Sequence, residues 1–130
     1  MTILLVDDHD DTRYALKEWF ELGGHKVLDA PDKKTGLSLG RKHAFDVLIC
    51  DLQLSDGDGW ELMTALRAEK PIVGIAMSGH CAAADMARSK AAGFLTHLVK
   101  PTPSDEMEAA LAAAHRELGR TNQQAKRAGA

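Results

Sequence analysis

Five short apolar runs alternate along the chain with five stretches in which apolar residues recur at helical spacing. The first, third and fourth runs are apolar almost throughout, which is typical of parallel strands that are buried on both faces. All five runs are rich in leucine or β-branched residues and are predicted to be β-strands: Thr2–Val6, Lys26–Leu28, Asp46–Cys50, Ile72–Met77 and Leu95–Val99.

Helices are predicted in the stretches between and after these runs. Asp58 and Glu61 resemble a capping box at the start of the third helix, and Gly93 and Gly119 lie just past helix ends, where a left-handed residue is favoured. The five predicted helices are Asp10–Leu22, Asp32–Lys42, Asp58–Ala68, Ala82–Ala92 and about Ser104–Leu118.

Strict alternation of strand and helix predicts right-handed crossovers and a parallel sheet with helices on both faces. The fold class is therefore α/β, a doubly wound five-stranded parallel sheet with five helices. A closed barrel is excluded because it needs eight such units. One domain is expected over residues 1–119. Residues 120–130 are polar or small and lack apolar spacing, which predicts a disordered tail.

Composition narrows the classes of protein. The chain is 45% hydrophobic and 27% charged, with a formal net charge of −3. It contains no apolar run of about 20 residues that could span a bilayer and begins without a signal-peptide pattern, so we expect a cytoplasmic protein that contacts no membrane. No stripe of Lys and Arg predicts direct nucleic-acid binding. Cys50 and Cys81 lack metal-binding spacing and are expected to be reduced thiols.

Polar residues follow four of the predicted strands. Asp7 and Asp8 follow the first strand, Asp51 the third, Ser78 the fourth and Lys100 the fifth. Because open parallel sheets bind ligands outside the carboxyl ends of their strands, we expect these side chains to share one edge. Carboxylates at ~4 Å repel by about 4 kcal/mol per pair at an effective dielectric near 20, so the cluster needs a cation or shared protons. Hard oxygen ligands with room for water suit Mg²⁺.

This arrangement predicts phosphoryl chemistry. A carboxylate beside Mg²⁺ can attack phosphorus and form an aspartyl phosphate. Lys100 would supply a fixed positive charge for the phosphoryl oxygens, and Ser78 a hydroxyl donor. The sequence contains neither a GxxxxGKS/T nor a GxGxxG loop. The site is therefore expected to be built from side chains.

These motifs together resemble the response-regulator receiver family of two-component signalling. The resemblance rests on Asp7-Asp8, the segment Asp51–Gly59, Ser78-Gly79 and Lys100-Pro101, and it covers residues 2–118 in the family's order and spacing. It implies a flavodoxin-like fold with strand order 2-1-3-4-5. The stretch Gly93–Pro101 is similar to receivers attached to hybrid histidine kinases. That similarity favours a piece of a larger protein, whereas Met1 directly before the first strand and the short tail favour a stand-alone regulator.

The resemblance also implies a phosphoacceptor and a set of metal ligands. Asp51 would be the phosphoacceptor. Asp8 and Asp51 would bind Mg²⁺ directly, together with the backbone carbonyl of Gln53, and Asp7 would bind through a metal-bound water. Gln53 and His80 occupy positions that tune the lifetime of the phosphoryl group in this family.

Three further positions are implied to act in the switch. Lys100 would pair with the phosphoryl group, and its peptide bond to Pro101 would be cis. Ser78 would shift toward the phosphate and transmit the signal. His97 takes the place of the usual switch Tyr or Phe, so it is a candidate switch residue that departs from the family pattern.

Two other departures concern the scaffold. Ser55 stands where a proline is usual, which predicts a more mobile loop after the acceptor. Gly36 replaces a common alanine in the second helix, at a cost of about 1 kcal/mol in helix propensity. Neither residue belongs to the acidic cluster.

The expected function is a phosphoacceptor signalling domain whose only catalysis is its own phosphorylation and dephosphorylation. A sensor histidine kinase or a histidine phosphotransfer protein would be the donor. A downstream protein partner is expected on the face formed by the fourth helix, fifth strand and fifth helix.

Two alternatives come from other classes. The first is a Mg²⁺-dependent aspartyl-phosphate phosphohydrolase like the haloacid dehalogenase superfamily. That superfamily needs a second acid two residues after the nucleophile, where this chain has Gln53. The second is a flavodoxin-like redox carrier, for which the chain lacks a phosphate-binding hydroxyl loop.

Overall fold

The computed structural model describes residues 1–79 and 82–128, with only the backbone over 122–128. His80 and Cys81 therefore lie outside the described residues, as do the predictions made for them. Within the described part of the chain, no helix combines the length and the apolar character that a membrane span requires.

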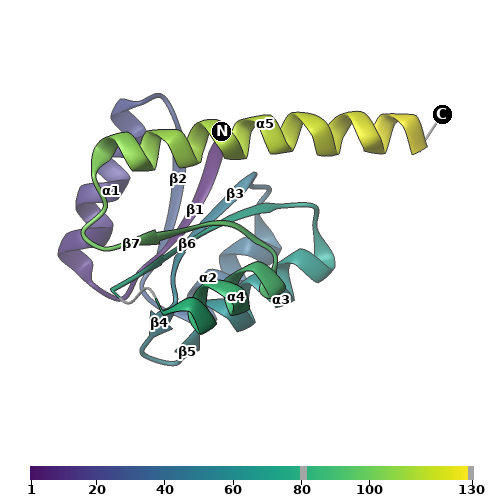
Figure 1. The fold of residues 1–130 in the computed structure, drawn as a ribbon. Helices are drawn as coiled ribbons and strands as arrows, with labels where there is room; N and C mark the ends of the chain where they lie inside the picture. Colours follow the sequence, from purple (N-terminus) through teal and green to yellow (C-terminus); the bar gives the residue numbers. More distant parts are fainter. Residues whose placement is uncertain (80–81, 129–130) are drawn as a thin grey trace.

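In the described residues, five parallel strands form one sheet in the order β2-β1-β3-β6-β7 (Figure 1). Counted as five strands along the chain, this is the order 2-1-3-4-5 that the family resemblance implied. The flavodoxin-like, doubly wound fold is thereby confirmed. Each strand begins and ends within two residues of its predicted position: β1 (Thr2–Val6), β2 (Lys26–Ala30), β3 (Val47–Asp51), β6 (Val73–Ser78) and β7 (Phe94–Val99).

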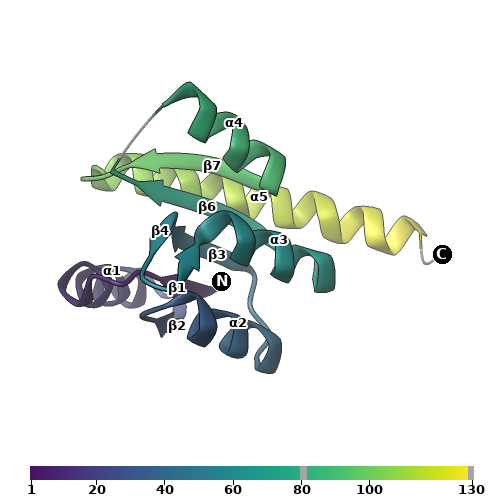
Figure 2. The ribbon, with the colours of Figure 1, turned by 90° about the horizontal axis from the view of Figure 1, so that it is seen from below.

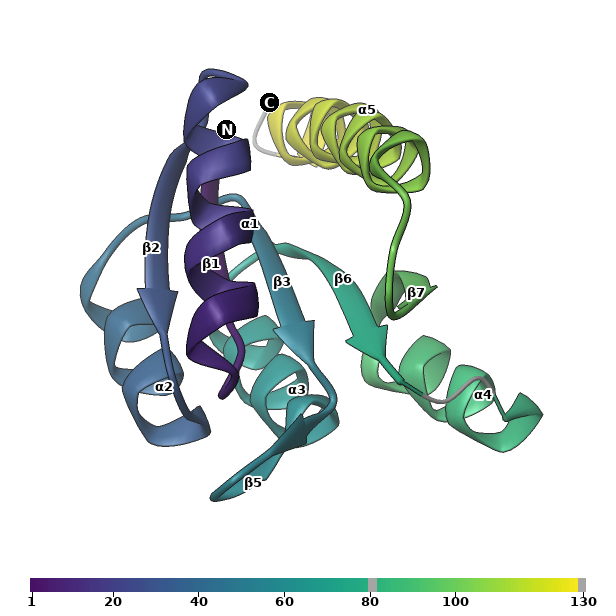
Figure 3. The same ribbon diagram turned by 90° about the vertical axis from the view of Figure 1, so that its left-hand side faces the viewer.

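Helices cover both faces of this sheet, as Figure 3 shows. One face carries α1 (Asp10–Leu22) and α5 (Ser104–Ala128). The other face carries α2 (Lys33–Lys42), α3 (Gly59–Glu69) and α4 (Ala83–Ala92), with α4 beside β7 (Figure 2). The alternation of strands and helices predicted this arrangement.

The core is divided into two layers by the sheet. Leu4 and Val6 pack with α2 and α3, whereas Ile3 and Leu5 pack with α1 and α5. Successive side chains of a strand point to opposite faces, so a strand that is covered on both sides needs apolar residues at every position. This is the physical reason for the unbroken apolar runs in the sequence.

Two helix starts carry side-chain caps, of which the sequence suggested the one at Asp58. The carboxylate of Asp32 accepts a hydrogen bond from the backbone N–H of Thr35 at 2.7 Å, and that of Asp58 accepts one from Glu61 at 2.8 Å. The carboxylate of Glu61 pairs with Lys33 at 2.5 Å. Because Asp32 and Asp58 are caps, α2 and α3 begin one residue later than predicted.

The end of α5 was predicted wrongly. The prediction placed it near Leu118 with Gly119 just beyond, but the helix continues through Ala128 and projects past the sheet (Figure 1). Residues 120–128, for which the sequence predicted disorder, are thus helical. Arg, Gln, Ala and Lys favour helix, and one glycine costs only about 1 kcal/mol, so Gly119 need not end the helix.

The loop after β3 contains a short antiparallel pair that was not predicted. It consists of β4 (Gln53–Leu54) and β5 (Gly57–Asp58), and Gln53 lies opposite Asp58. Pairing of two-residue strands leaves no periodic signal in the sequence. The pair connects the end of β3 to the start of α3.

Packing explains why α2 carries a glycine at position 36. A methyl group at Gly36 would lie 2.9 Å from Cγ2 of Val6 and 3.3 Å from Cδ2 of Leu62. The first of these distances is shorter than normal carbon contacts. Gly36 therefore allows α2 to approach β1 and α3 closely.

Candidate functional site

The carboxyl ends of β1 and β3 bring three acidic side chains together. One ligand atom from each of Asp7, Asp8 and Asp51, and one from His9, lie within 4.8 Å of one another. Strands β1 and β3 are hydrogen-bonded neighbours with parallel register, so the residues at their ends meet. Asp7 has no exposed surface and Asp51 is 5% exposed. The predicted acidic cluster is present, and His9, which was not predicted, lies beside it.

Lys100 lies between two of these carboxylates. Its ammonium nitrogen is 2.8 Å from Oδ2 of Asp7 and 2.9 Å from Oδ2 of Asp51. Burial opposes the charge of Lys100, but its hydrogen bonds to Asp7 and Asp51 outweigh burial and raise the pKa of the ammonium above its ordinary value. Lys100 therefore remains charged. Its peptide bond to Pro101 is cis, as the resemblance implied.

Each oxygen of the Asp51 carboxylate has a defined partner. Oδ2 accepts from Lys100, and Oδ1 accepts from the backbone N–H of Gln53 at 3.0 Å. The side chain of Gln53 is exposed, whereas its backbone N–H points toward the acidic cluster. A carboxylate with both oxygens oriented is held ready for one geometry of attack.

The cluster has more negative charge than its one ammonium neutralises. Oδ1 of Asp8 is buried and accepts no hydrogen bond from any described residue. The Nδ1 atom of His9 lies 3.2 Å from this oxygen and makes an ion pair only if the imidazole is protonated. Three carboxylates, with one unsatisfied buried oxygen, are a donor set that fits a hard divalent cation.

Ser78 shares the same edge of the sheet. It is the last residue of β6 and is 5% exposed. Its neighbour Met77 lies opposite Asp51 in the register of β3 and β6, so Ser78 is one residue further along. The backbone carbonyl of Ser78 accepts a hydrogen bond from the backbone N–H of Lys100 at 2.8 Å.

Arg13 is a buried cation that the sequence interpretation missed. Its guanidinium donates to the backbone carbonyl of Asp7 at 2.7 Å, to Asp10 at 2.7 Å and to Asp29 at 3.1 Å. Arg13 is 4% exposed and ties the loop that carries the acids to the end of β2. The spacing of three residues between Asp10 and Arg13 on α1 was the one sequence feature that could have indicated an ion pair of Arg13.

His97, the candidate switch residue, lies on β7 and is half-buried. Its Nδ1 lies 3.0 Å from Oγ of Ser89 on α4, and its Nε2 is buried without a hydrogen-bond partner in the described part of the chain. The indole N–H of Trp60 donates to the same serine oxygen at 2.9 Å. Neither contact of Ser89 could be predicted from the pattern of residues along the chain.

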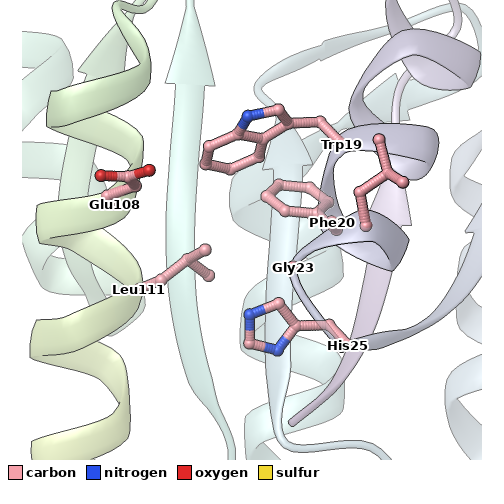
Figure 4. Close-up of a pocket in the computed structure, with 7 residues that line it drawn as sticks. Trp19, Phe20, Gly23, His25, Glu108 and Leu111 are labelled. Carbon is pink, nitrogen blue, oxygen red and sulfur yellow. The ribbon is translucent and has the colours of Figure 1, made fainter.

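A separate pocket lies between α1 and α5 (Figure 4). Trp19, Phe20 and His25 line it from the end of α1 and the turn that follows, and Leu111 and Glu108 line it from α5. Asp7 and Asp8 of the acidic cluster directly precede α1, whereas the pocket lies at the carboxyl end of that helix. The pocket is therefore remote from the candidate site.

Comparisons with known proteins agree with this geometry. The family model of the response regulator receiver domain matches residues 3–112. The virulence sensor protein BvgS of Bordetella pertussis is 32% identical over 115 residues, which cover 82% of this chain and 9% of BvgS. Sporulation initiation phosphotransferase F of Bacillus subtilis is 29% identical over 110 residues, covering 84% of this chain and 89% of that protein.

A solved structure extends the comparison to the fold. The chemotaxis protein CheY4 of Vibrio cholerae matches with a TM-score of 0.82 and 25% sequence identity, over 87% of this chain and 97% of that one. The chain thus spans nearly all of some relatives but only a small part of the BvgS sensor protein.

Proposed function

Because the chain belongs to the response regulator receiver domain family, and is therefore a phosphoacceptor domain of two-component signalling, we propose that Asp51 receives the phosphoryl group. The observation that carries this proposal is the orientation of its carboxylate by Lys100 and by the amide of Gln53. Asp51 also ends a fully buried strand beside Asp7 and Asp8. Asp7 is also held at both oxygens, by Lys100 and by the backbone N–H of His9, but it has no exposed surface that a phosphoryl donor could reach.

The proposed cofactor is Mg²⁺. Asp8 and Asp51 would hold the ion directly with the backbone carbonyl of Gln53, and Asp7 through a water. The unsatisfied oxygen of Asp8 and the excess of carboxylates support this assignment. When bound, the ion neutralises charge on the phosphoryl oxygens during transfer.

The residues of the chain have separate roles in the proposed transfer. A carboxylate oxygen of Asp51 forms a bond to phosphorus while the bond from phosphorus to the donor's histidine nitrogen breaks. Lys100 places a positive charge beside the transferred oxygens, and the hydroxyl of Ser78 donates to one of them. The low exposure of Asp51 and Ser78 limits access of bulk water.

Receiver domains interact with histidine kinases and phosphotransfer proteins. We propose such a protein as the donor in the cytoplasm, and a downstream protein partner on the face of α4, β7 and α5. Met86 on α4 and Leu95 on β7 are 43% and 42% exposed, which supports an apolar contact there. Signalling through this face, rather than substrate turnover, is the proposed output.

Labelling with acetyl phosphate tests the acceptor. Wild-type protein in Mg²⁺ should gain one phosphoryl group by intact-mass spectrometry, and Asp51→Asn should gain none. Asp56→Asn is the matched control, because Asp56 lies in the same loop but binds the backbone of α2 instead. Efficient labelling of Asp51→Asn, or of wild type in excess chelator, would contradict the acceptor or the metal assignment respectively.

A further inference from the structure

The helix α4 buries few of its side chains against the domain. Its buried residue is Ser89, which is 2% exposed, and no side chain caps its first turn at Ala82. Ala92 packs against the core but is only partly buried. A helix of ten residues is too short to be stable alone in water, so these contacts decide where α4 lies.

Ser89 joins α4 to two other elements through hydrogen bonds. An indole N–H is a donor only, so the oxygen of Ser89 accepts from Trp60 on α3. The hydroxyl proton of Ser89 is then directed to Nδ1 of His97 on β7. Because Nδ1 accepts this proton in a hydrogen bond, the N–H of a neutral His97 imidazole is assigned to Nε2.

Arg88, the neighbour of Ser89, strengthens the same connection. Its guanidinium carbon lies 4.0 Å from the centroid of the Trp60 ring, and its Nη2 lies 3.7 Å from Oδ2 of Asp58. Both residues belong to the start of α3, where Asp58 is the N-cap. Consecutive residues of α4 therefore contact the same turn of α3.

The start of α3 is also connected to the proposed acceptor, Asp51. Asp58 lies opposite Gln53 in the β4–β5 pair, and the amide of Gln53 donates to the carboxylate of Asp51. A continuous series of contacts thus runs from Asp51 to α4. A change at the acceptor can reach α4 through backbone that is already hydrogen-bonded to it.

His97 is held at one nitrogen only. Its Nε2 is buried, and no described residue is its hydrogen-bond partner. A buried polar atom without a partner costs free energy, so the ring gains if it moves to a position where Nε2 is satisfied. The contact with Ser89 opposes that movement.

We propose that Trp60, Ser89 and His97 form a latch, which holds α4 in its unphosphorylated position and opens when Asp51 is phosphorylated. This inference rests on the proposed function of Asp51. A contact that exists only in the unphosphorylated form must oppose phosphorylation, because binding and conformation are thermodynamically linked. Weakening the latch therefore raises the affinity for a phosphoryl mimic.

The test is a titration with beryllofluoride in Mg²⁺, followed by fluorine NMR. Ser89→Ala should bind beryllofluoride about fivefold more tightly than wild type, since one hydrogen bond corresponds to about that factor. Trp60→Phe should act in the same direction, because it removes the donor and keeps an aromatic ring under Arg88. Ser38→Ala, the same change at an exposed site of α2, should leave the affinity unchanged.

Hydrogen exchange gives a second measurement that does not depend on the ligand. In the free protein, Ser89→Ala and Trp60→Phe should accelerate exchange in residues 83–92 but not in α1. Unchanged or weaker beryllofluoride binding in both variants would overturn the latch, as would unchanged exchange in α4. Equal binding by wild type and Asp51→Asn would instead overturn the proposed acceptor. If Ser89→Ala fails to fold by circular dichroism, Trp60→Phe alone decides.

Discussion

Lys100 and Asp7 are 93 residues apart in the chain, yet the ammonium of one lies 2.8 Å from a carboxylate oxygen of the other. Asp7 has no exposed surface, so this contact holds a buried negative charge. The same ammonium also pairs with Asp51. One cation thus compensates two buried carboxylates.

Removal of this cation should destabilise the free protein. We expect Lys100→Met to lower the free energy of unfolding by about 2 kcal/mol in chelator, because it leaves two buried carboxylates unpaired. The deficit should shrink in millimolar Mg²⁺, since a bound cation stabilises the folded state and replaces the missing charge. Urea unfolding with and without Mg²⁺ measures both effects.

Lys17→Met is the matched control for this variant. Lys17 pairs with the partly exposed Asp29 at 3.2 Å and does not contact the cluster. Its loss should cost less than about 1 kcal/mol and should not depend on Mg²⁺. A deficit in Lys100→Met that stays constant with Mg²⁺ would contradict the metal site.

Stability at alkaline pH should depend on Lys100. Burial acts against its charge, but the hydrogen bonds to Asp7 and Asp51 raise its pKa in the folded state. A raised pKa gives stability that is fully present below the unfolded value of about 10.4 and is lost as pH rises through the folded value. The difference in unfolding free energy between wild type and Lys100→Met should therefore be constant to about pH 10 and then fall. A difference that grows above pH 10 would show the opposite sign of shift.

Gly36→Ala should destabilise the protein despite the better helix propensity of alanine. The new methyl group would meet Val6 at 2.9 Å, and overpacking of a core typically costs about 1–3 kcal/mol. The middle of that range, about 2 kcal/mol, exceeds the gain of about 1 kcal/mol from helix propensity. Thermal or urea unfolding should show a net loss, and a stabilised variant would mean that α2 can move away from β1 without cost.

Gly119→Ala should have the opposite effect. Apart from the adjacent residues and the backbone of α5 itself, no atom of the described residues lies within 4 Å of the added methyl group, and Gly119 is inside α5. Its φ is not positive, unlike that of Gly93 at the end of α4. We expect a gain of up to about 1 kcal/mol and more helical circular dichroism. Destabilisation would instead indicate that the helix ends at this glycine.

Cys50 should be unreactive in the folded protein. Burial, followed by the negative charge of Asp51, raises the pKa of its thiol well above the ordinary value, so the reactive thiolate is scarce. In a Cys81→Ser variant, a disulfide reagent at pH 8 should modify the chain only when denaturant is added. Rapid reaction of the native variant would show that β3 opens locally.

Much of the site followed from the order of elements along the chain. Once the apolar runs are assigned as parallel strands, their carboxyl ends must meet at one edge, which places Asp7, Asp51 and Lys100 near one another. No knowledge of packing angles is needed for this step. The unbroken apolar runs likewise determined that both faces of the sheet are covered.

Contacts between helices depended on the tertiary structure alone. Trp60 and Ser89 are 29 residues apart and belong to different helices, and their contact depends on how closely α3 and α4 pack. The buried position of Arg13 and the close approach at Gly36 depend on packing in the same way. Periodicity indicates which face of a helix is apolar, but it does not determine which polar atoms of two neighbouring helices meet. Those pairings are decided by the angles and distances at which side chains fill the core.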